Sequence, residues 1–562
     1  MTVILTAAEM RAIEQAAMSS GEVTGLELME RAGRGVVEAI FEKWPDLAGT
    51  SHRARVLCGP GNNGGDGFVV ARLLKEWGWE VEVSLPGTPG KLPPDAKTNF
   101  DKWCQLAGIE PDLRPGKSDT SRGAGPPPDL LVDALFGTGL CRPLGSPFND
   151  ELEHWGGFTA ERGIRELPSQ QRPFRVVSVD IPSGLCSDSG RVLGASIRAD
   201  LTVSFHAPKR GHFLNRGMDL CGNLAVVSLG LDDPSRNAEA NAADAPETGV
   251  RLAGIVADPS RLRKVHGHKY DHGHVLVVSG GPGRTGAARL AARGALRIGA
   301  GLVTIACPET ALTEVASQTT AVMCRVLDDA AGLREALEDD RIAALCLGPG
   351  LGVGMDARAL VLTALAAPRS QAARIGAGAT PNGGEFGSED DRTGRRPVVL
   401  DADALTCFMQ DPEILFDALH EDCVLTPHAG EFGRLFPEIA ERLAAPATAG
   451  PAYSKIDATR EAARRAGCTI LFKGPDTVIS DSSGRCVMNA SVRERDAPWL
   501  ATAGSGDVLA GFITGLLARG LVPLEAAEAA AWMHTECAIS FGPGLVAEDM
   551  PEELPNVFRQ LA

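Results

Sequence analysis

The chain has 562 residues, of which 44% are hydrophobic and 23% are charged, and its formal charge at pH 7 is −17. This length exceeds what one hydrophobic core usually supports, so two or more domains are expected. The excess of acidic residues argues against a protein that holds nucleic acid or a membrane surface through its overall charge.

The cysteines and the first twenty residues indicate the compartment. The 13 cysteines are scattered singly, which favours a reducing environment over a disulfide framework or a structural zinc site. Glu9, Arg11 and Glu14 interrupt residues 1–20, so no signal peptide is expected there. The sequence contains no run of about 18 apolar residues, so no transmembrane helix is expected. The sequence therefore predicts a cytoplasmic protein.

The N-terminal part of the chain alternates predicted helices and short apolar strands. Two helices are expected within residues 6–42, with Thr6 and Thr24 as N-caps. A strand at 56–58 leads into a glycine-rich loop at 59–67 and a helix from Phe68 to Trp77. Further strand candidates are short and continuous, as strands buried on both faces should be: 81–85, 130–132, 176–179, 201–205 and 224–227.

A linker is expected at residues 233–250, which are small and polar and lose the hydrophobic period. The same pattern then restarts, so residues 1–232 and 251–562 are predicted to form two doubly wound α/β domains. The glycine- and charge-rich residues 375–396 interrupt the alternation of strands and helices and are expected to form a surface loop. The second domain is expected to contain a helix at 286–298 and strands at 275–278, 302–305, 344–347, 398–400, 424–425 and 469–472.

Two segments match the G-x-G-x-x-G dinucleotide-binding fingerprint between a predicted strand and a predicted helix. They are Gly59–Gly64 and Gly281–Gly286, and they keep a dehydrogenase open as an alternative. Against it, the strand after the first segment ends without an acid that could bind an adenosine ribose. After the second segment, Glu309 lies at a tolerable distance but in a predicted loop.

Polar clusters follow three predicted strands of the first domain, at Asn62–Gly67, Asp133–Gly139 and Asp180–Gly184. Because the carboxyl ends of parallel strands share one edge of a sheet, these clusters are expected to meet around one site. The amides and carboxylate of the first cluster suit hydroxyl groups or a hard cation better than a pyrophosphate. A single strand-end aspartate is more often a turn former, but three such clusters make that interpretation strained.

A second candidate site lies at Ala503–Asp507, where small residues and an acid precede an apolar run with helical spacing. Free N–H groups and the positive end of the helix dipole favour an anion there. The charge of Asp507 beside a phosphate would cost energy unless this residue handles a proton or binds a metal. The alternative is a glycine-rich turn with an acidic cap.

Other strand ends of the second domain could complete this site. The backbone of Gly348–Gly352 allows close approach of a ligand, and Lys473 could place a cation beside phosphates. His428 could hydrogen-bond a ligand, and Asp401 and Asp403 could orient a lysine or a magnesium shell. Taken singly, each is also compatible with an ordinary turn or an exposed side chain.

Taken together, the motifs resemble two families that commonly occur fused. Gly61–Gly67, Asp133–Gly139 and Asp180–Gly184, in this order, are similar to the YjeF N-terminal domain of NAD(P)H-hydrate epimerases. The remainder resembles a ribokinase-like NAD(P)H-hydrate dehydratase. The motifs that carry this second resemblance are Gly348–Gly352, Asp401–Leu405, Thr426–Glu431, Lys473–Thr477 and Gly504–Asp507. The resemblance covers nearly the whole chain and implies a bifunctional enzyme that repairs hydrated nicotinamide cofactors.

For the first domain, the resemblance implies interconversion of the R and S hydrates of NADH and NADPH. It implies a potassium ion at Asn63, Asp133 and Ser183, and it makes Asp180 the acid/base candidate at C6 of the nicotinamide ring. The implied substrate contacts are Asn62, Asn63, Gly64, Gly65, Asp66, Gly137, Thr138, Gly139, Leu140, Cys141, Arg142, Pro143 and Asp180.

For the second domain, the resemblance implies dehydration of the S hydrate with magnesium and ADP, giving AMP and phosphate, with ATP open as a second donor. Asp507 would take the proton of the hydrate's hydroxyl during phosphoryl transfer, and the phosphorylated carbon would then lose phosphate. The hydrate would lie at Ala287, Gly350, His428 and Asp507. The nucleotide would lie at Lys473, Gly474, Pro475, Asp476, Thr477 and Gly506.

Two alternative functions remain from the sequence. One is a true small-molecule kinase that releases a stable phosphorylated product, and the other is a non-catalytic binding scaffold. Asp180 and Asp507 within complete motifs argue against the scaffold. The expected partners are the two hydrates and ADP or ATP, without nucleic acid or membrane, and the chain is expected to form a homo-oligomer.

Overall fold

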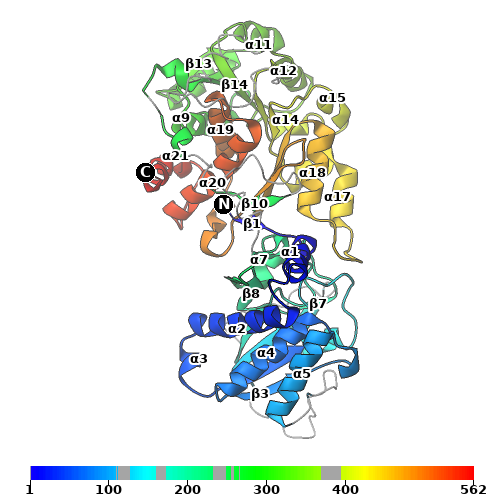
Figure 1. Cartoon of the computed structure of the whole chain (residues 1–562). Coiled ribbons are helices and arrows are strands. Elements are labelled where there is room, and N and C mark those ends of the chain that lie inside the picture. Colours follow the sequence, from blue (N-terminus) through cyan, green and yellow to red (C-terminus); the bar gives the residue numbers. More distant parts are fainter. Residues whose placement is uncertain are drawn as a thin grey trace. The chain divides into compact units, whose positions relative to one another are not determined.

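The computed structural model describes residues 2–108, 111, 127–159, 172–231, 249–254, 259–264, 266–368 and 394–561 (Figure 1). It divides into two compact units. The N-terminal unit comprises Val3–Ala245 and Ala445–Ser454, and the C-terminal unit comprises Pro246–Ala444 and Lys455–Ala562 with Met1–Thr2. Within the described ranges, none of the helices has the length and hydrophobicity that spanning a bilayer requires.

Two segments singled out in the sequence lie mainly outside the described residues. Of the predicted linker at 233–250, only residues 249 and 250 are described, and Val250 is the first residue of a strand. Of the predicted surface loop at 375–396, only residues 394–396 are described. Arg396 there is 2% exposed, whereas the preceding Arg395 is exposed.

The N-terminal unit is built on a parallel sheet in the order β3-β2-β4-β6-β8-β9. All strands expected in this half are present, and their parallel pairing confirms the predicted α/β architecture. The sheet strands are β2 (Arg53–Cys58), β3 (Glu80–Ser84), β4 (Leu130–Ala134), β6 (Arg175–Val179), β8 (Leu201–Phe205) and β9 (Asn223–Val227), and the short strands are β1 (Val3–Ile4), β5 (Phe158–Thr159) and β7 (Ala195–Ser196).

Helices cover this sheet because its strands are apolar on both faces. One face packs against α2, α4 and α5, which lie side by side in Figure 1, and the other face packs against α6. Thr6 and Thr24 cap α1 and α2, as predicted, each in a capping box. The helices are α1 (Ala7–Ser19), α2 (Gly25–Lys43), α3 (Asp46–Gly49), α4 (Asn62–Glu76), α5 (Pro94–Ala107), α6 (Phe148–His154) and α7 (Gly217–Leu220).

The helix after the glycine-rich loop begins earlier than the sequence predicts, at Asn62 instead of Phe68. Its glycines are required by close packing. A Cβ atom at Gly64 would overlap the carbonyl oxygen of Gly59, and one at Gly67 would lie 2.7 Å from the Cβ of Ala134. Packing of α4 directly on the strand ends therefore outweighs the low helix propensity of glycine. As a result, Asn62, Asn63 and Asp66 project from the first turns of a helix rather than from a loop.

The C-terminal unit contains a larger sheet, with strands in the order β10-β19-β18-β17-β16-β15-β14-β11-β12-β13. The pairs β17–β18 and β18–β19 are antiparallel, whereas the other pairs are parallel. The strands are β10 (Val250–Leu252), β11 (His274–Val278), β12 (Leu302–Cys307), β13 (Met323–Val326), β14 (Ile342–Leu347), β15 (Val398–Leu400), β16 (Cys423–Leu425), β17 (Thr469–Phe472), β18 (Asp476–Ser480) and β19 (Cys486–Ala490).

The largest core of this unit lies between one face of the sheet and α9, α19, α20 and α21. On α19, every residue from Val508 to Ala518 is buried, which fixes the position of its N-terminus. The helices are α9 (Thr285–Arg297), α10 (Leu312–Gln318), α11 (Ala330–Ala336), α12 (Met355–Leu365), α14 (Asp403–Thr406), α15 (Pro412–Phe416), α16 (Ala429–Leu435), α17 (Pro437–Ala444), α18 (Lys455–Ala466), α19 (Ser505–Ala518), α20 (Pro523–Phe541) and α21 (Asp549–Gln560).

Candidate active sites

Asp180 is the centre of the candidate site in the N-terminal unit. It follows β6 with a φ angle of +67°, so the chain turns sharply there and brings a buried carboxylate to the strand end. Its Oδ2 accepts a hydrogen bond from the Thr138 N–H at 3.1 Å, and its Oδ1 accepts one from Ser204 Oγ at 3.4 Å. The sequence motifs at Asp133–Gly139 and Asp180–Gly184 are thus brought together at one edge of the sheet, as predicted.

Lys209 also belongs to this site, although it was not among the site residues predicted from the sequence. Its Nζ lies 3.4 Å from Asp180 Oδ1, and the side chain is fully buried. The same Nζ donates hydrogen bonds to the carbonyl oxygens of Phe205 and Ala207 and to Ser204 Oγ. Its position shortly after strand β8 could have indicated it, because that strand ends at the same edge of the sheet.

The pKa of Asp180 reflects competition between burial and these partners. Burial opposes ionisation, but the charges of Lys209 and His212 and the N–H of Thr138 outweigh it, so the pKa lies below its ordinary value. The Asp180 side chain is therefore an ionised carboxylate, held by a buried lysine. Such a group is a poised proton acceptor.

Two further acids show the opposite shift. Burial and the negative charge of Asp180 raise the pKa of Asp66 well above its ordinary value, and the same two causes raise the pKa of Glu14. Asp66 was among the predicted residues, whereas Glu14 of α1 was not. An acid whose ionisation is disfavoured, close to an ionised carboxylate, supplies both partners of acid–base chemistry.

Asn63, Asp133 and Ser183 also converge. Asp133 is fully buried, and its carboxylate accepts hydrogen bonds from Ser183 Oγ at 2.5 Å and from the Ser183 N–H at 2.8 Å. Ser183 Oγ in turn accepts the Phe136 N–H at 2.9 Å. A Cβ atom at Gly137 would lie 2.9 Å from Asn63 Oδ1. This set of amide, hydroxyl and carboxylate oxygens with a single charge fits a monovalent cation.

The other predicted contacts of this site fall into two groups. Gly64 and Gly65 are buried, and a Cβ atom at Gly65 would lie 2.5 Å from the sulfur of Met29, so they serve the packing of α4. In contrast, the tip of the loop at 137–143 is accessible to a ligand. Its exposed residues are Gly139, Cys141, Arg142 and Pro143.

Asp507 lies in the first turn of α19, after Gly504 with a φ angle of +88°. Burial and the negative charge of Asp401 raise its pKa to about 7, Lys473 opposes this rise, and Asp403 adds to it. An aspartate with this pKa both releases and accepts a proton near neutral pH. It lies at the start of a helix, where backbone N–H groups and the helix dipole favour a phosphate.

Lys473 is placed by an ion pair with Asp401. Its Nζ lies 2.6 Å from Asp401 Oδ1, which also accepts a hydrogen bond from Thr426 Oγ1 at 2.8 Å. Although burial disfavours the charged amine, Asp401 raises the pKa of Lys473 above its ordinary value. A Cβ atom at Gly506 would lie 3.4 Å from this Nζ, so the predicted nucleotide residues Lys473 and Gly506 are adjacent.

Lys455 supports the predicted nucleotide segment and was missed in the sequence. Its Nζ lies 2.7 Å from Asp476 Oδ1 and donates to the carbonyl oxygen of Lys473 at 3.2 Å. Thr477 Oγ1 closes the turn by donating to the Gly474 carbonyl oxygen at 2.7 Å. The signal for Lys455 is weak, because a lysine at the start of a helix has no motif around it.

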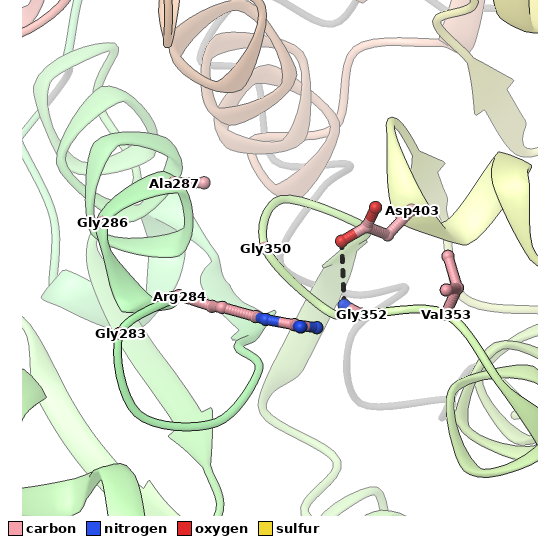
Figure 2. A pocket seen from close by; sticks show the side chains of 8 residues that line it. All are labelled: Gly283, Arg284, Gly286, Ala287, Gly350, Gly352, Val353 and Asp403. Carbon is pink, nitrogen blue, oxygen red and sulfur yellow. Dashed lines mark hydrogen bonds between the residues drawn. The ribbon is translucent and has the colours of Figure 1, made fainter.

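A cleft of about 570 Å³ lies beside this region (Figure 2). It brings together Ala287 and Gly350, both predicted to contact the hydrate. Asp403 accepts a hydrogen bond from the Gly352 N–H at 2.8 Å, and the Arg284 side chain extends toward Gly352, with Nη1 2.9 Å from where a Cβ atom of Gly352 would stand. The residues that line the cleft are Gly283, Arg284, Gly286, Ala287, Gly350, Gly352, Val353 and Asp403.

His428 caps α16 and is therefore oriented by the backbone. Its Nδ1 accepts the N–H groups of Gly430 at 2.9 Å and Glu431 at 3.3 Å. Its Nε2 lies 3.4 Å from Glu431 Oε1, and 55% of the side chain is exposed. Because Nδ1 acts as the acceptor, Nε2 carries a ring proton, and it lies beside Glu431 Oε1.

Comparison with known proteins decides the family. Residues 25–211 match the model of the YjeF-related protein N-terminus, and residues 275–554 match the model of NAD(P)H-hydrate dehydratase. A bifunctional NAD(P)H-hydrate repair enzyme of Moorella thermoacetica is 35% identical over 576 residues, covering 99% of this chain and 97% of the relative. The chain belongs to the family of bifunctional NAD(P)H-hydrate repair enzymes.

Two further relatives agree with this assignment. A protein of the same description from Salinibacter ruber is 33% identical over 99% of this chain and 96% of its own length. An NAD(P)H-hydrate epimerase of Roseobacter litoralis is 43% identical over 41% of this chain and 99% of its own length. A solved Bacillus subtilis structure, described as an ADP/ATP-dependent NAD(P)H-hydrate dehydratase co-crystallised with ATP/Mg²⁺, is 23% identical, with a TM-score of 0.42 over 56% of this chain and 99% of its own.

The predicted family and the bifunctional activity are thereby confirmed. The repair enzyme carries an NAD(P)H-hydrate epimerase in its N-terminal half and an NAD(P)H-hydrate dehydratase in its C-terminal half. The dehydrogenase, kinase and scaffold alternatives are set aside. The roles of individual residues stay predictions that rest on the geometry above.

Proposed function

We propose that the two sites act in sequence, with Asp180 as the base of epimerisation and Asp507 as the base of dehydration. The observation that carries this proposal is the pair of site aspartates with opposite pKa shifts. Asp180 lies beside the buried Lys209, and Asp507 is influenced by the charge of Lys473, which itself pairs with Asp401. Asp180 is held ionised by Lys209. Asp507, in contrast, titrates near neutral pH and can both accept and return a proton.

For epimerisation, the reacting carbon is C6 of the hydrate, which carries the hydroxyl group and is bonded to the ring nitrogen N1. Asp180 takes the hydroxyl proton as the C6–N1 bond breaks, which forms a carbonyl at C6 while N1 receives a proton from Asp66. Rotation and reclosure then form the C6–N1 bond on the other face, and the two protons return. Each proton removed has a named acceptor, and no nucleotide is consumed.

For dehydration, Asp507 takes the proton of the C6 hydroxyl group while the oxygen of that hydroxyl group bonds to the terminal phosphorus of ADP. The bond between that phosphorus and the AMP oxygen breaks, and the α19 N–H groups and Lys473 stabilise the charge that develops. The phosphorylated carbon then loses phosphate, and the departing phosphate takes a proton from C5 as the C5–C6 double bond forms. The products are NAD(P)H, AMP and phosphate.

The bound ions would support these steps without forming bonds to carbon. Asn63, Asp133 and Ser183 would hold potassium, which would fix the loop that carries Thr138. Magnesium would arrive with ADP and neutralise its phosphates. Asp401 already binds Lys473, so we assign it to orienting that lysine rather than to holding the metal.

We further propose that the chain forms a homo-oligomer and acts in the cytoplasm. Light scattering tests the oligomeric state, and cell fractionation tests the compartment.

The test is restoration of dihydronicotinamide absorbance from purified hydrates. With ADP present, the S hydrate should be restored with equal release of AMP and phosphate, and the R hydrate should follow through epimerisation. The same assay with ATP identifies the preferred phosphoryl donor. Accumulation of a stable phosphorylated hydrate would instead indicate a kinase and contradict the proposal.

A further inference from the structure

The segment Ala445–Ser454, called the strap below, follows α17 and precedes α18 in the sequence, but it belongs to the N-terminal unit. The predicted domain boundaries placed it in the second domain. Its Gly450 N–H donates to the carbonyl oxygen of Cys141 at 2.9 Å. The Arg191 guanidinium donates to the carbonyl oxygen of Ala445. The strap is therefore held by backbone and side-chain contacts, not by proximity alone.

The strap also completes a small apolar cluster. Ala452 is 7% exposed and packs with Cys186 and Leu193, which are 2% and 0% exposed, and its N–H lies 3.4 Å from Cys186 Sγ. Leu193 connects two loops of the epimerase site: its N–H donates to Gly184 at 2.6 Å, and its carbonyl oxygen accepts the Leu144 N–H at 3.0 Å. The strap thus rests on the loops that follow Asp133 and Asp180.

Gly450 marks the closest approach of the strap to the substrate loop. A Cβ atom there would lie 2.7 Å from the carbonyl oxygen of Leu140, 3.2 Å from the Cα of Cys141 and 3.3 Å from Leu193 Cδ1. The φ angle of Gly450 is outside the left-handed region, so the backbone conformation does not require glycine. The requirement is for space against the loop, because two of these three atoms belong to the backbone.

We infer that the strap is a positioning element of the epimerase site that sets the loop at 137–143 for hydrate binding, an inference that rests on the proposed function. The loop is connected to the catalytic carboxylate at Thr138, whose N–H donates to Asp180 and whose carbonyl oxygen accepts Ser187 Oγ at 3.4 Å. Displacement at Leu140 and Cys141, two and three positions further on, moves the exposed tip that faces a ligand. Lys209 has no part in these contacts, so its ion pair with Asp180 is preserved.

The experiment uses the full chain with Gly450→Ala, and Gly49→Ala as the matched control. Gly49 is an exposed glycine of the same unit, and a Cβ atom added to it would meet no atom within 4 Å. Conversion of purified R hydrate to S hydrate is followed by chromatography without nucleotide, and dehydration of the S hydrate with ADP is measured on the same samples. We expect Gly450→Ala to raise the KM for the R hydrate roughly tenfold with kcat within about twofold, because binding rather than chemistry is weakened.

A second variant keeps the inference testable if Gly450→Ala fails to fold. Arg191→Ala removes the bond to Ala445 without adding volume, and a smaller rise in the same KM is expected. The inference is overturned by an unchanged KM in both variants, or by parallel loss of epimerase and dehydratase activity. Absence of epimerisation by the unsubstituted chain and by Gly49→Ala would instead contradict the proposed function.

Discussion

Lys209 Nζ lies 3.4 Å from Asp180 Oδ1, and both side chains are buried. Because this amine is the main positive charge that lowers the pKa of Asp180, Lys209→Met should raise that pKa. The ionised form is the base, so the acid limb of kcat/KM for epimerisation should move to higher pH. A pH profile of the full-length variant measures this, with dehydration of the S hydrate as the internal reference.

The matched control is Lys91→Met, which removes an exposed lysine of the same unit and should leave the profile unchanged. Removing one partner of a buried ion pair costs about 3–5 kcal/mol of stability, so the thermal midpoint of the Lys209 variant should also fall. An unshifted acid limb in a folded Lys209→Met protein would mean that Lys209 does not set the protonation of Asp180.

Asp507→Asn keeps the size of the side chain but removes the proton acceptor. We expect dehydration to slow by roughly 10²–10⁴-fold, while ADP binding is kept or tightened because a negative charge near the phosphates is lost. Epimerisation should be unaffected, so the variant would equilibrate the two hydrates and repair neither. ADP titration with single-turnover dehydration tests this. Near-normal dehydration would remove Asp507 from the chemistry.

The raised pKa of Asp507 also predicts a pH-dependent cost in stability. Its pKa in the folded protein is about 7, compared with an ordinary value of 3.8, so the stability that it contributes is present at low pH and is lost as pH rises through about 7. The stability advantage of Asp507→Asn should therefore grow between about pH 4 and about pH 7 and then level off. Thermal midpoints at about pH 5 and about pH 8 measure it, and a larger advantage at the lower pH would contradict the assigned shift.

Epimerisation should depend on a monovalent cation of potassium size. Ser183→Ala removes one proposed oxygen ligand and the hydrogen bond to Asp133, and Asp133→Ala removes the only formal charge of the set. Both should weaken the potassium dependence and the epimerase rate while sparing dehydration. Activity is measured across potassium, sodium and lithium salts at fixed ionic strength. Identical dependence in the variants and the unsubstituted chain would place the ion elsewhere.

The N-terminal half should fold and epimerise on its own, because its sheet and main core lie within residues 3–231. A fragment of residues 1–232 lacks the strap, however, so its KM for the R hydrate should exceed that of the full chain, without any requirement for nucleotide. Steady-state kinetics of the two proteins in parallel provide the test. An unfolded fragment, or one that demands ADP, would contradict the predicted domain boundary.

Local patterns in the sequence determined most of the fold. The apolar runs indicated the buried strands, the Thr-x-x-Glu pattern after Thr6 indicated a capped helix, and strand-end clusters indicated where the sites lie. These features are readable because each is set by neighbours in the chain. The predicted start of α4 was wrong for the same reason: helix propensity is local, whereas the need for Gly64 and Gly67 comes from contact with Gly59 and Ala134.

Tertiary structure alone decided which charged groups act together. Lys209 and Asp180 do not belong to one sequence motif, and neither do Lys455 and Asp476. Burial in a low-dielectric interior nevertheless makes the two members of each pair interact strongly. The pKa of Asp507 depends on its distance from Asp401 and Lys473, which only the folded sheet sets. The strap is the clearest case. No local sequence pattern predicts its contacts. Glycine is needed at position 450 only because a Cβ atom there would lie too close to the backbone of Leu140 and Cys141, which are far away in the sequence.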